Sequence, residues 1–217
     1  MDPGTTRVLL VDDHPLFRAG LRRLLESDAQ LQVVAEAGSA AEALHQVRLS
    51  SPDLVVLDIA LPDRSGADLL ASLHAQRQGL AVLFLSAHPE EGFAPPLLRA
   101  GARGYLEKCC APDRILDAVR SVAAGQRYLT PTLAARLARE DVGLADLRHE
   151  RLSWRELQVF TRIARGVPPA ATAAELQLSV KTVGTYRARI LEKLGLASNA
   201  ELAAYAVRNH LLDTAVH

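Results

Sequence analysis

Apolar positions along the first 125 residues fall into two patterns, short continuous runs and stretches with helical spacing. The runs are rich in Val and Leu, apolar on both faces, which is typical of parallel strands covered by helices. The predicted strands span 7–11, 31–35, 54–57, 80–85 and 103–106. The predicted helices between them span 15–25, 40–47, 67–74, 96–100 and 114–123. Five such units predict an α/β fold with a doubly wound, five-stranded parallel sheet.

After Leu152 the pattern is helical throughout, without strand spacing. Ser153 and Glu156 have the spacing of a capping box, which predicts a helix start. The same spacing recurs after Ser198, while Ser179 begins a helix that Gly195 ends. These signals predict a small all-α domain of four short helices with a helix-turn-helix.

The intervening segment resembles neither half. Thr130-Pro131 can begin a helix that continues to about Ala138, and 140–148 is a polar connector. The predicted domains are therefore 1–125, a linker over 126–150, and 151–217.

Composition narrows the class of protein. Hydrophobic residues make up 49% and charged residues 23%, so the chain can bury cores and is not disordered. Residues 1–145 hold 15 Lys and Arg against 18 Asp and Glu, whereas 146–217 hold 10 against 7. These opposite balances suggest two units with different partners. No run of 18 apolar residues and no signal region is present, and two adjacent cysteines make no disulfide framework or zinc site, so we expect a cytoplasmic protein without membrane contact.

Carboxylates follow two of the predicted strands. Asp12 and Asp13 come directly after the first strand and Asp58 after the third. If the strand order is 2-1-3-4-5, these strands are neighbours and the carboxylates converge at the carboxyl edge. Such a cluster is unfavourable without a cation, and oxygen ligands suit Mg²⁺. Ser86 and Lys108, after the fourth and fifth strands, join the same edge.

Together these groups suit phosphoryl transfer to a carboxylate. A nucleophilic Asp, Mg²⁺ on the phosphoryl oxygens and a Lys for the developing charge are its usual parts. Each residue alone is commonplace, since an Asp after a strand is most often a helix cap. The prediction of phosphoryl transfer rests on finding these residues together at the carboxyl ends of four different strands.

Residues 7–124 resemble a bacterial response-regulator receiver domain, with its flavodoxin-like fold. The resemblance is carried by Asp12-Asp13, Asp58 with Leu61-Pro62 and Gly66, Ser86-Ala87, and Gly101-Ala102-Arg103-Gly104-Tyr105-Leu106-Glu107-Lys108. It implies that a sensor histidine kinase phosphorylates Asp58. It implies a Mg²⁺ site made by Asp12, Asp13, Asp58 and the carbonyl of Ala60. It also implies that Ser86 and Lys108 contact the phosphoryl group, and that Ser86 and Tyr105 form the switch.

One segment departs from that family. Gly92 and the pair Pro95-Pro96 disfavour a regular helix over 88–96, because Pro lacks an amide donor and restricts the residue before it. We expect the fourth helix to begin near Pro95, after a loop.

The helix predicted after Ser179 has an apolar stripe of Val183, Ile190 and Leu194. The opposite face suits a recognition helix in the DNA major groove, with Lys181 and Thr185 for base edges and the arginines for phosphates. The candidate DNA-binding residues are Lys181, Thr182, Gly184, Thr185, Arg187, Ala188, Arg189 and Lys193.

Residues 152–212 resemble a LuxR-type helix-turn-helix. The motifs that carry the resemblance are Leu152-Ser153-Trp154-Arg155-Glu156, Ile163-Ala164-Arg165-Gly166, Leu178-Ser179, Lys181-Thr182-Val183, Lys193-Leu194-Gly195 and Glu201-Leu202. The whole chain therefore resembles a NarL/FixJ-type two-component response regulator. The resemblance implies promoter DNA as partner and a homodimer when phosphorylated. Pro168-Pro169 replaces a polar helix start, and Gly184, Thr185 and Ala188 replace longer side chains, so we expect few direct base contacts.

Other functions stay open at this point. One is a signalling protein whose output is a protein contact, or phosphate-independent DNA binding. Another is an aspartyl-phosphate hydrolase, although Ala60 stands where its general acid would be, and we expect no enzyme. A dinucleotide-binding fold is excluded, because no Gly-x-Gly-x-x-Gly follows the first strand.

Overall fold

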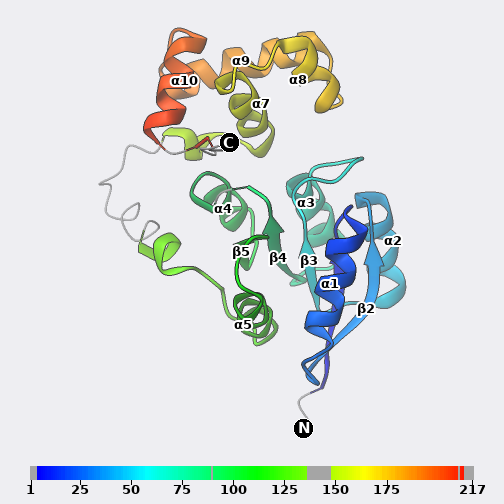
Figure 1. Ribbon diagram of the computed structural model, residues 1–217. Coiled ribbons are helices and arrows are strands. Elements are labelled where there is room, and N and C mark those ends of the chain that lie inside the picture. The colour runs from blue at the N-terminus through cyan, green and yellow to red at the C-terminus, as the bar shows by residue number, and fades with distance from the viewer. Residues whose placement is uncertain (1–3, 89, 136–147, 210, 213–217) are drawn as a thin grey trace. The chain divides into compact units, whose positions relative to one another are not determined.

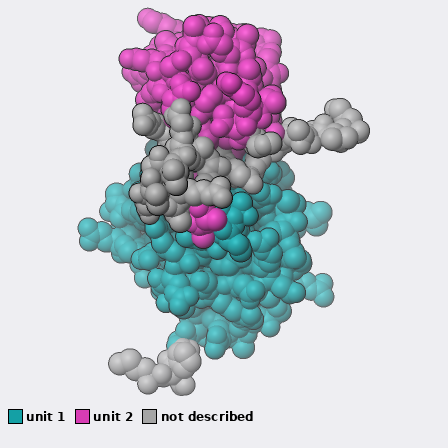
Figure 2. Space-filling model, turned by 90° about the vertical axis from the view of Figure 1, so that its left-hand side faces the viewer, with its two compact units in different colours: residues 1–90, 97–132 teal, residues 91–96, 133–217 magenta. Residues whose placement is uncertain are grey.

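The computed structural model describes residues 4–88, 90–135, 148–209 and 211–212 (Figure 1). The chain divides into two compact units (Figure 2). An α/β unit contains residues 1–90 and 97–132, and a second unit contains 91–96 and 133–217. No helix among the described residues is long and apolar enough to span a membrane.

The sheet of the α/β unit is five-stranded and entirely parallel. Its strands are β1 (Thr6–Val11), β2 (Leu31–Ala37), β3 (Leu54–Leu57), β4 (Ala81–Ser86) and β5 (Gly104–Glu107). The order is β2-β1-β3-β4-β5, which confirms the doubly wound fold and makes β1 and β3 neighbours.

Both faces of the sheet are buried, as the continuous apolar runs predict. The helices are α1 (Pro15–Leu25), α2 (Ala40–Ser50), α3 (Gly66–Gln76), α4 (Glu90–Arg99) and α5 (Pro112–Ala123). α1 and α5 share one core with alternate strand residues such as Val8, Leu10 and Val56. The intervening residues, such as Leu9 and Val55, are fully buried on the opposite face, because side chains alternate along a strand.

The prediction for the fourth helix was wrong. α4 begins at Glu90 and contains Pro95 and Pro96, although each proline removes an amide donor. A hydrogen bond at the helix start and the burial of apolar side chains compensate for the lost amide donors. The amide of Glu90 donates to a carboxylate oxygen of Glu107 at 3.1 Å, which fixes the helix start. The apolar side chains of Leu97 and Leu98, in the part of α4 that belongs to the α/β unit, are buried, and this burial outweighs the weak propensity.

The second unit contains the four predicted helices after a short 3-10 turn, η1 (Arg148–Arg151). They are α7 (Trp154–Ala164), α8 (Pro169–Glu175), α9 (Val180–Leu194) and α10 (Asn199–Arg208). The capping box of Ser153 and Glu156 is fully formed, and Ser179 and Ser198 cap α9 and α10. Gly195 ends α9 with a φ of 63°, the left-handed conformation that glycine adopts without strain.

The predicted linker helix is helical over residues 131–135. Its remainder and most of the polar connector lie outside the described residues.

Candidate functional site

Three carboxylates meet at the carboxyl edge of the sheet. Val11 pairs with Leu57 at the ends of β1 and β3, so the following residues Asp12, Asp13 and Asp58 are brought together. Their ligand atoms and one from His14 all lie within 4.8 Å of one another. Asp12 and Asp58 are each only 3% exposed.

Lys108 lies against the two buried carboxylates. Its Nζ is 2.6 Å from Oδ2 of Asp12 and 2.7 Å from Oδ2 of Asp58. Burial works against the charged ammonium, but its hydrogen bonds to both carboxylates outweigh that effect and raise the pKa of Lys108. Burial also raises the pKa of Asp58, against the opposing influence of Lys108. One cation thus stands against two buried carboxylates, with Asp13 exposed beside them.

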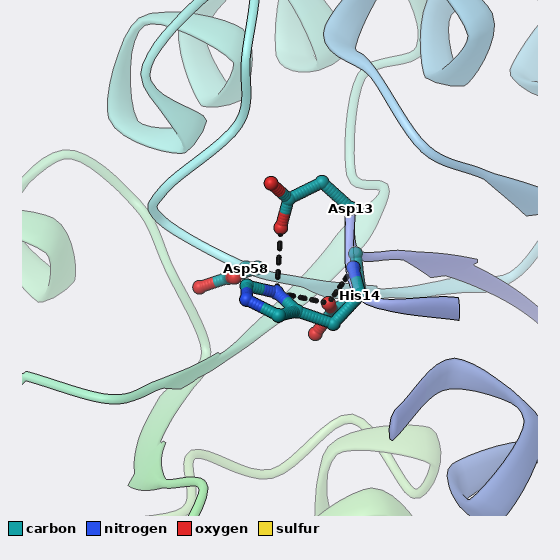
Figure 3. Close-up of side chains that lie close together, drawn as sticks. Asp13, His14 and Asp58 are labelled. Atoms are coloured by element: carbon teal, nitrogen blue, oxygen red, sulfur yellow. Dashed lines mark hydrogen bonds and ion pairs between the residues drawn. The ribbon is translucent and has the colours of Figure 1, made fainter. Parts of the chain in front are cut away.

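His14 belongs to the cluster although the sequence analysis did not single it out. Figure 3 shows its imidazole and the carboxylate of Asp13 directed toward each other beside Asp58. Nδ1 of His14 is 2.7 Å from Oδ1 of Asp13 and 3.2 Å from Oδ1 of Asp12. Its position directly after two aspartates was the available signal.

The donor set fits a hard divalent cation. Asp12, Asp13 and Asp58 offer carboxylate oxygens, and Asp13 leaves the cluster open to solvent. Mg²⁺ prefers such oxygens and retains several waters, so a partly open cluster suits it.

Ser86 and Tyr105 converge on one residue. Both side chains are fully buried. The amide of His88 donates to Oγ of Ser86 at 3.2 Å, and Oη of Tyr105 donates to the carbonyl of His88 at 2.7 Å. Burial raises the pKa of Tyr105 well above its ordinary value, so its phenol stays a donor. The two candidate switch residues therefore hold the same loop through the amide and the carbonyl of one residue, His88.

The loop after Asp58 is fixed at two points. Gly66 donates to the carbonyl of Ile59 at 2.8 Å, and a Cβ at Gly66 would lie 2.3 Å from the carbonyl oxygen of Asp58. Asp63 accepts hydrogen bonds from the amides of Ala40 and Ala41 at the start of α2, at 2.8 and 2.9 Å. This clamp was not predictable from the sequence, because nothing local links residue 63 to residue 40.

In the helical unit, most candidate DNA-binding side chains of α9 are exposed. Lys181, Gly184, Thr185, Ala188 and Arg189 are open to solvent on the face opposite the buried Val183, Ile190 and Leu194. The hydroxyl of Thr185 donates to the carbonyl of Lys181 at 3.1 Å.

The other three candidates have partners within the unit. Oγ1 of Thr182 is 2.7 Å from Oγ of the cap residue Ser179. Nε of Arg187 donates to Oδ1 of Asn199 at 2.7 Å. Nζ of Lys193 is 2.6 Å from Oε2 of Glu156 and ties α9 to α7.

Comparison with known proteins identifies a family for each half of the chain. Residues 8–120 match the response regulator receiver domain, and residues 150–206 match bacterial regulatory proteins of the luxR family. The transcriptional regulatory protein UhpA of Salmonella typhimurium is 43% identical over 196 residues, covering 90% of this chain and 95% of UhpA. The transcriptional activator protein ExaE of Pseudomonas putida is 41% identical, covering 96% of this chain and 99% of ExaE.

Solved structures agree in fold. The response regulator ChrA of a heme-sensing two-component system is 33% identical, covers 96% of this chain and all of ChrA, and has a TM-score of 0.52. RcsB of Salmonella enterica serovar Typhimurium, bound to a promoter in the presence of phosphomimetic BeF₃⁻, has a TM-score of 0.70 at 22% identity, with 93% of this chain and 98% of RcsB covered.

The fold and the two sites define a response regulator, with a receiver domain followed by a DNA-binding helix-turn-helix. The chain belongs to the NarL/FixJ type of this family, in which the DNA-binding domain is LuxR-type.

Proposed function

We propose that a sensor histidine kinase phosphorylates Asp58 in a Mg²⁺-dependent reaction. The phosphorylated chain then dimerises and binds promoter DNA in the bacterial cytoplasm to regulate transcription. The observation that carries this proposal is Lys108, whose ammonium lies within 2.7 Å of carboxylates on two different strands. The family membership supports it.

The chemistry of the transfer follows from the charges around Asp58. An oxygen of the ionised carboxylate attacks phosphorus as the P–N bond to the kinase imidazole breaks, and the imidazole leaves with its electron pair and takes up a proton. Lys108 favours the ionised carboxylate and is placed to hold the charge that develops on the phosphoryl oxygens. Asp12, Asp13, Asp58 and the carbonyl of Ala60 would hold Mg²⁺, which would supply further charge neutralisation.

Signal transmission uses the residues around His88. A phosphoryl group on Asp58 offers the hydroxyl of Ser86 a strong acceptor, and a shift of Ser86 toward it disturbs the hydrogen bond that its Oγ accepts from the amide of His88. The same movement disturbs the bond from Tyr105 to the His88 carbonyl. The receiver thereby acquires two states, and phosphorylation selects between them.

The output is DNA binding by α9. Lys181 and Thr185 contact base edges and Arg187 and Arg189 bind phosphates. Thr182, Gly184, Ala188 and Lys193 complete the DNA-facing surface. Two copies of the chain bind half-sites related by two-fold symmetry. RcsB, which has the same fold, was solved bound to a promoter, and this supports promoter DNA as the partner.

Intact mass spectrometry tests the phosphoacceptor. Wild type and Asp58→Ala are incubated with Mg²⁺ and either the cognate kinase or a small phosphodonor such as acetyl phosphate. We expect one phosphoryl adduct in the wild type and none in Asp58→Ala. The absence of an adduct with both donors, in folded protein, contradicts the proposal. Multiple turnover of a chromogenic phosphoester would favour a hydrolase instead.

A DNA-binding assay tests the output. We expect a promoter fragment to shift more strongly with the phosphorylated wild type than with Asp58→Ala. If both proteins bind equally, DNA binding is phosphate-independent. If neither binds any promoter fragment, the output is a protein contact.

A further inference from the structure

A second site lies at the opposite edge of the receiver sheet from Asp58. A hollow of about 440 Å³ is formed where α3 ends and where β4 and β5 begin. It is lined by His74, Gln78, Gly79, Leu80, Gly101, Arg103 and Arg127. Because β4 and β5 carry the phosphorylation machinery at their other ends, this hollow shares no residue with the acidic cluster.

The backbone around the hollow is held in place by glycine turns and strand pairing. Gly79 and Gly101 have φ values of 79° and 105°, in the region that favours glycine. A Cβ at Gly101 would lie 2.8 Å from Cε1 of His74, so the imidazole occupies the space that a side chain would take. The amide of Arg103 donates to Val82, and the carbonyl of Arg103 accepts from Tyr128, both at 2.8 Å. The last contact also places Arg127, the residue before Tyr128.

Charge in the hollow is entirely of one sign. Two guanidinium groups, an imidazole and an amide line it, and none of its lining residues is Asp or Glu. Among the described residues no carboxylate forms an ion pair with Arg103 or Arg127.

Each guanidinium has most of its donors left over. Arg103 donates from one nitrogen to the carbonyl of Gly125 at 3.3 Å. Arg127 donates from one nitrogen to the carbonyl of Leu98 at 3.0 Å. Since a guanidinium carries five N–H donors in a planar fork, each can still bind a phosphate or carboxylate with two parallel hydrogen bonds.

We propose that this hollow, the basic pocket, binds a small anion with at least two negative charges carried on phosphate or carboxylate groups. A volume of about 440 Å³ lies in the range of small-molecule sites. Two guanidiniums share one hollow without a counter-charge. They favour a polyvalent anion over a monovalent one, because the second negative charge of the anion can pair with the second guanidinium. The proposal does not depend on phosphorylation of Asp58.

The test uses amide NMR shifts of the full chain titrated with pyrophosphate or with citrate, in Mg²⁺-free buffer at 0.15 M salt. We expect saturable shifts at Gly79, Gly101 and Arg103, weakening as salt rises. The tighter of the two anions identifies phosphate or carboxylate as the preferred group. The proposal is overturned if neither anion moves these amides, or if the shifts lie only on α9.

Variants separate the basic pocket from general surface charge. We expect Arg103→Gln and Arg127→Gln each to weaken binding by about tenfold or more, since each removes a charge-assisted pair. Arg48→Gln, an exposed arginine outside the pocket, is the matched control. Gln78→Glu adds a carboxylate to the lining without disturbing either arginine, so it must weaken binding even if an arginine variant fails to fold. Unchanged affinity in Gln78→Glu, or an equal loss in Arg48→Gln, refutes the proposal.

Discussion

Lysine is rare in this chain, and two of its three lysines form ion pairs with buried carboxylates. Only three of the 25 basic residues are Lys. Two of them, Lys108 and Lys193, have their ammonium groups 2.6 Å from buried carboxylates. A compact ammonium fits beside two buried oxygens where a planar fork does not. The third, Lys181, is exposed on α9.

Gly66 gives the sharpest prediction at the residue scale. Because a Cβ there would lie 2.3 Å from the Asp58 carbonyl oxygen, the backbone must move. We expect Gly66→Ala to lower the free energy of unfolding by about 1–3 kcal/mol, as overpacking does, and to slow phosphorylation of Asp58. Calorimetry and the rate of adduct formation measure the two effects.

The control for Gly66→Ala is another Gly→Ala change. Gly20 lies within α1 with no atom within 4 Å of its would-be Cβ. We expect Gly20→Ala to stabilise the protein by up to about 1 kcal/mol, because alanine has the higher helix propensity. Equal stability changes in the two variants would show that the close approach at Gly66 has no energetic importance.

At the scale of elements, the clamp from Asp63 joins the loop that follows Asp58 to the start of α2. Partial burial raises the pKa of Asp63, but the amides of Ala40 and Ala41 outweigh this and hold it below its ordinary value. A carboxylate at a helix N-terminus is also favoured by the helix dipole. The clamp therefore positions the segment that contains Ala60, a proposed Mg²⁺ ligand.

We expect Asp63→Asn to lower the free energy of unfolding by about 0.5–2 kcal/mol, the usual range for losing a helix cap. We also expect it to raise the Kd for Mg²⁺ severalfold, measured by isothermal titration calorimetry. Asp117→Asn removes an exposed carboxylate of α5 and serves as control. The clamp has no positioning role if Mg²⁺ binds both variants equally.

The ion pair of Glu156 and Lys193 joins α7 to α9, and we expect its contribution to stability to depend on pH. Oε2 of Glu156 accepts from the amide of Ser153 at 2.7 Å and from Nζ of Lys193 at 2.6 Å. Burial raises the pKa of Glu156, but these donors outweigh it and hold the pKa below its ordinary value of 4.5. The ionised form is thus favoured in the folded state. Its stabilisation is complete above pH 4.5 and is lost as the pH falls through the lower folded-state pKa.

We expect Glu156→Gln to destabilise the helical unit by about 1–3 kcal/mol at pH 7, and the difference from wild type to shrink below pH 4.5. Denaturant unfolding between pH 4 and 7 measures it. Trp154 is the chain's single tryptophan and lies in α7, so its fluorescence reports unfolding of the helical unit. Glu192→Gln, at an exposed position of α9, is the control. A loss that does not vary with pH would contradict the assignment to the charged form.

Elements with local signals were predictable from the sequence, and those set by distant contacts were not. The strands follow from apolar runs, and once the order 2-1-3-4-5 is assumed, the convergence of Asp12, Asp13 and Asp58 follows from the rule that ligands lie beyond strand ends. The start of α4 was missed because it depends on Glu107, 17 residues away. The Asp63 clamp and the basic pocket were missed for the same reason, since each joins residues more than 20 positions apart.

At the scale of the whole molecule, the two halves of the chain oppose each other in charge. Residues 1–145 hold three more acidic than basic residues, and 146–217 hold three more basic than acidic ones. Phosphorylation of Asp58 adds roughly 1.5 to 2 further negative charges, which repels DNA. A gain in DNA affinity on phosphorylation therefore does not come from the charge of the phosphoryl group itself and must come from conformation or dimerisation.

The salt dependence of DNA binding distinguishes these sources. If phosphorylation acts by dimerisation, the phosphorylated chain contacts two half-sites and neutralises about twice as many DNA phosphates as one copy does. The slope of log K against log salt then roughly doubles on a two-half-site fragment. We expect this doubling for the phosphorylated wild type, together with a gain of about tenfold or more in affinity. On a single half-site, or with Asp58→Ala, we expect neither change. A tenfold gain with an unchanged slope would instead assign the effect to release of α9 within one copy.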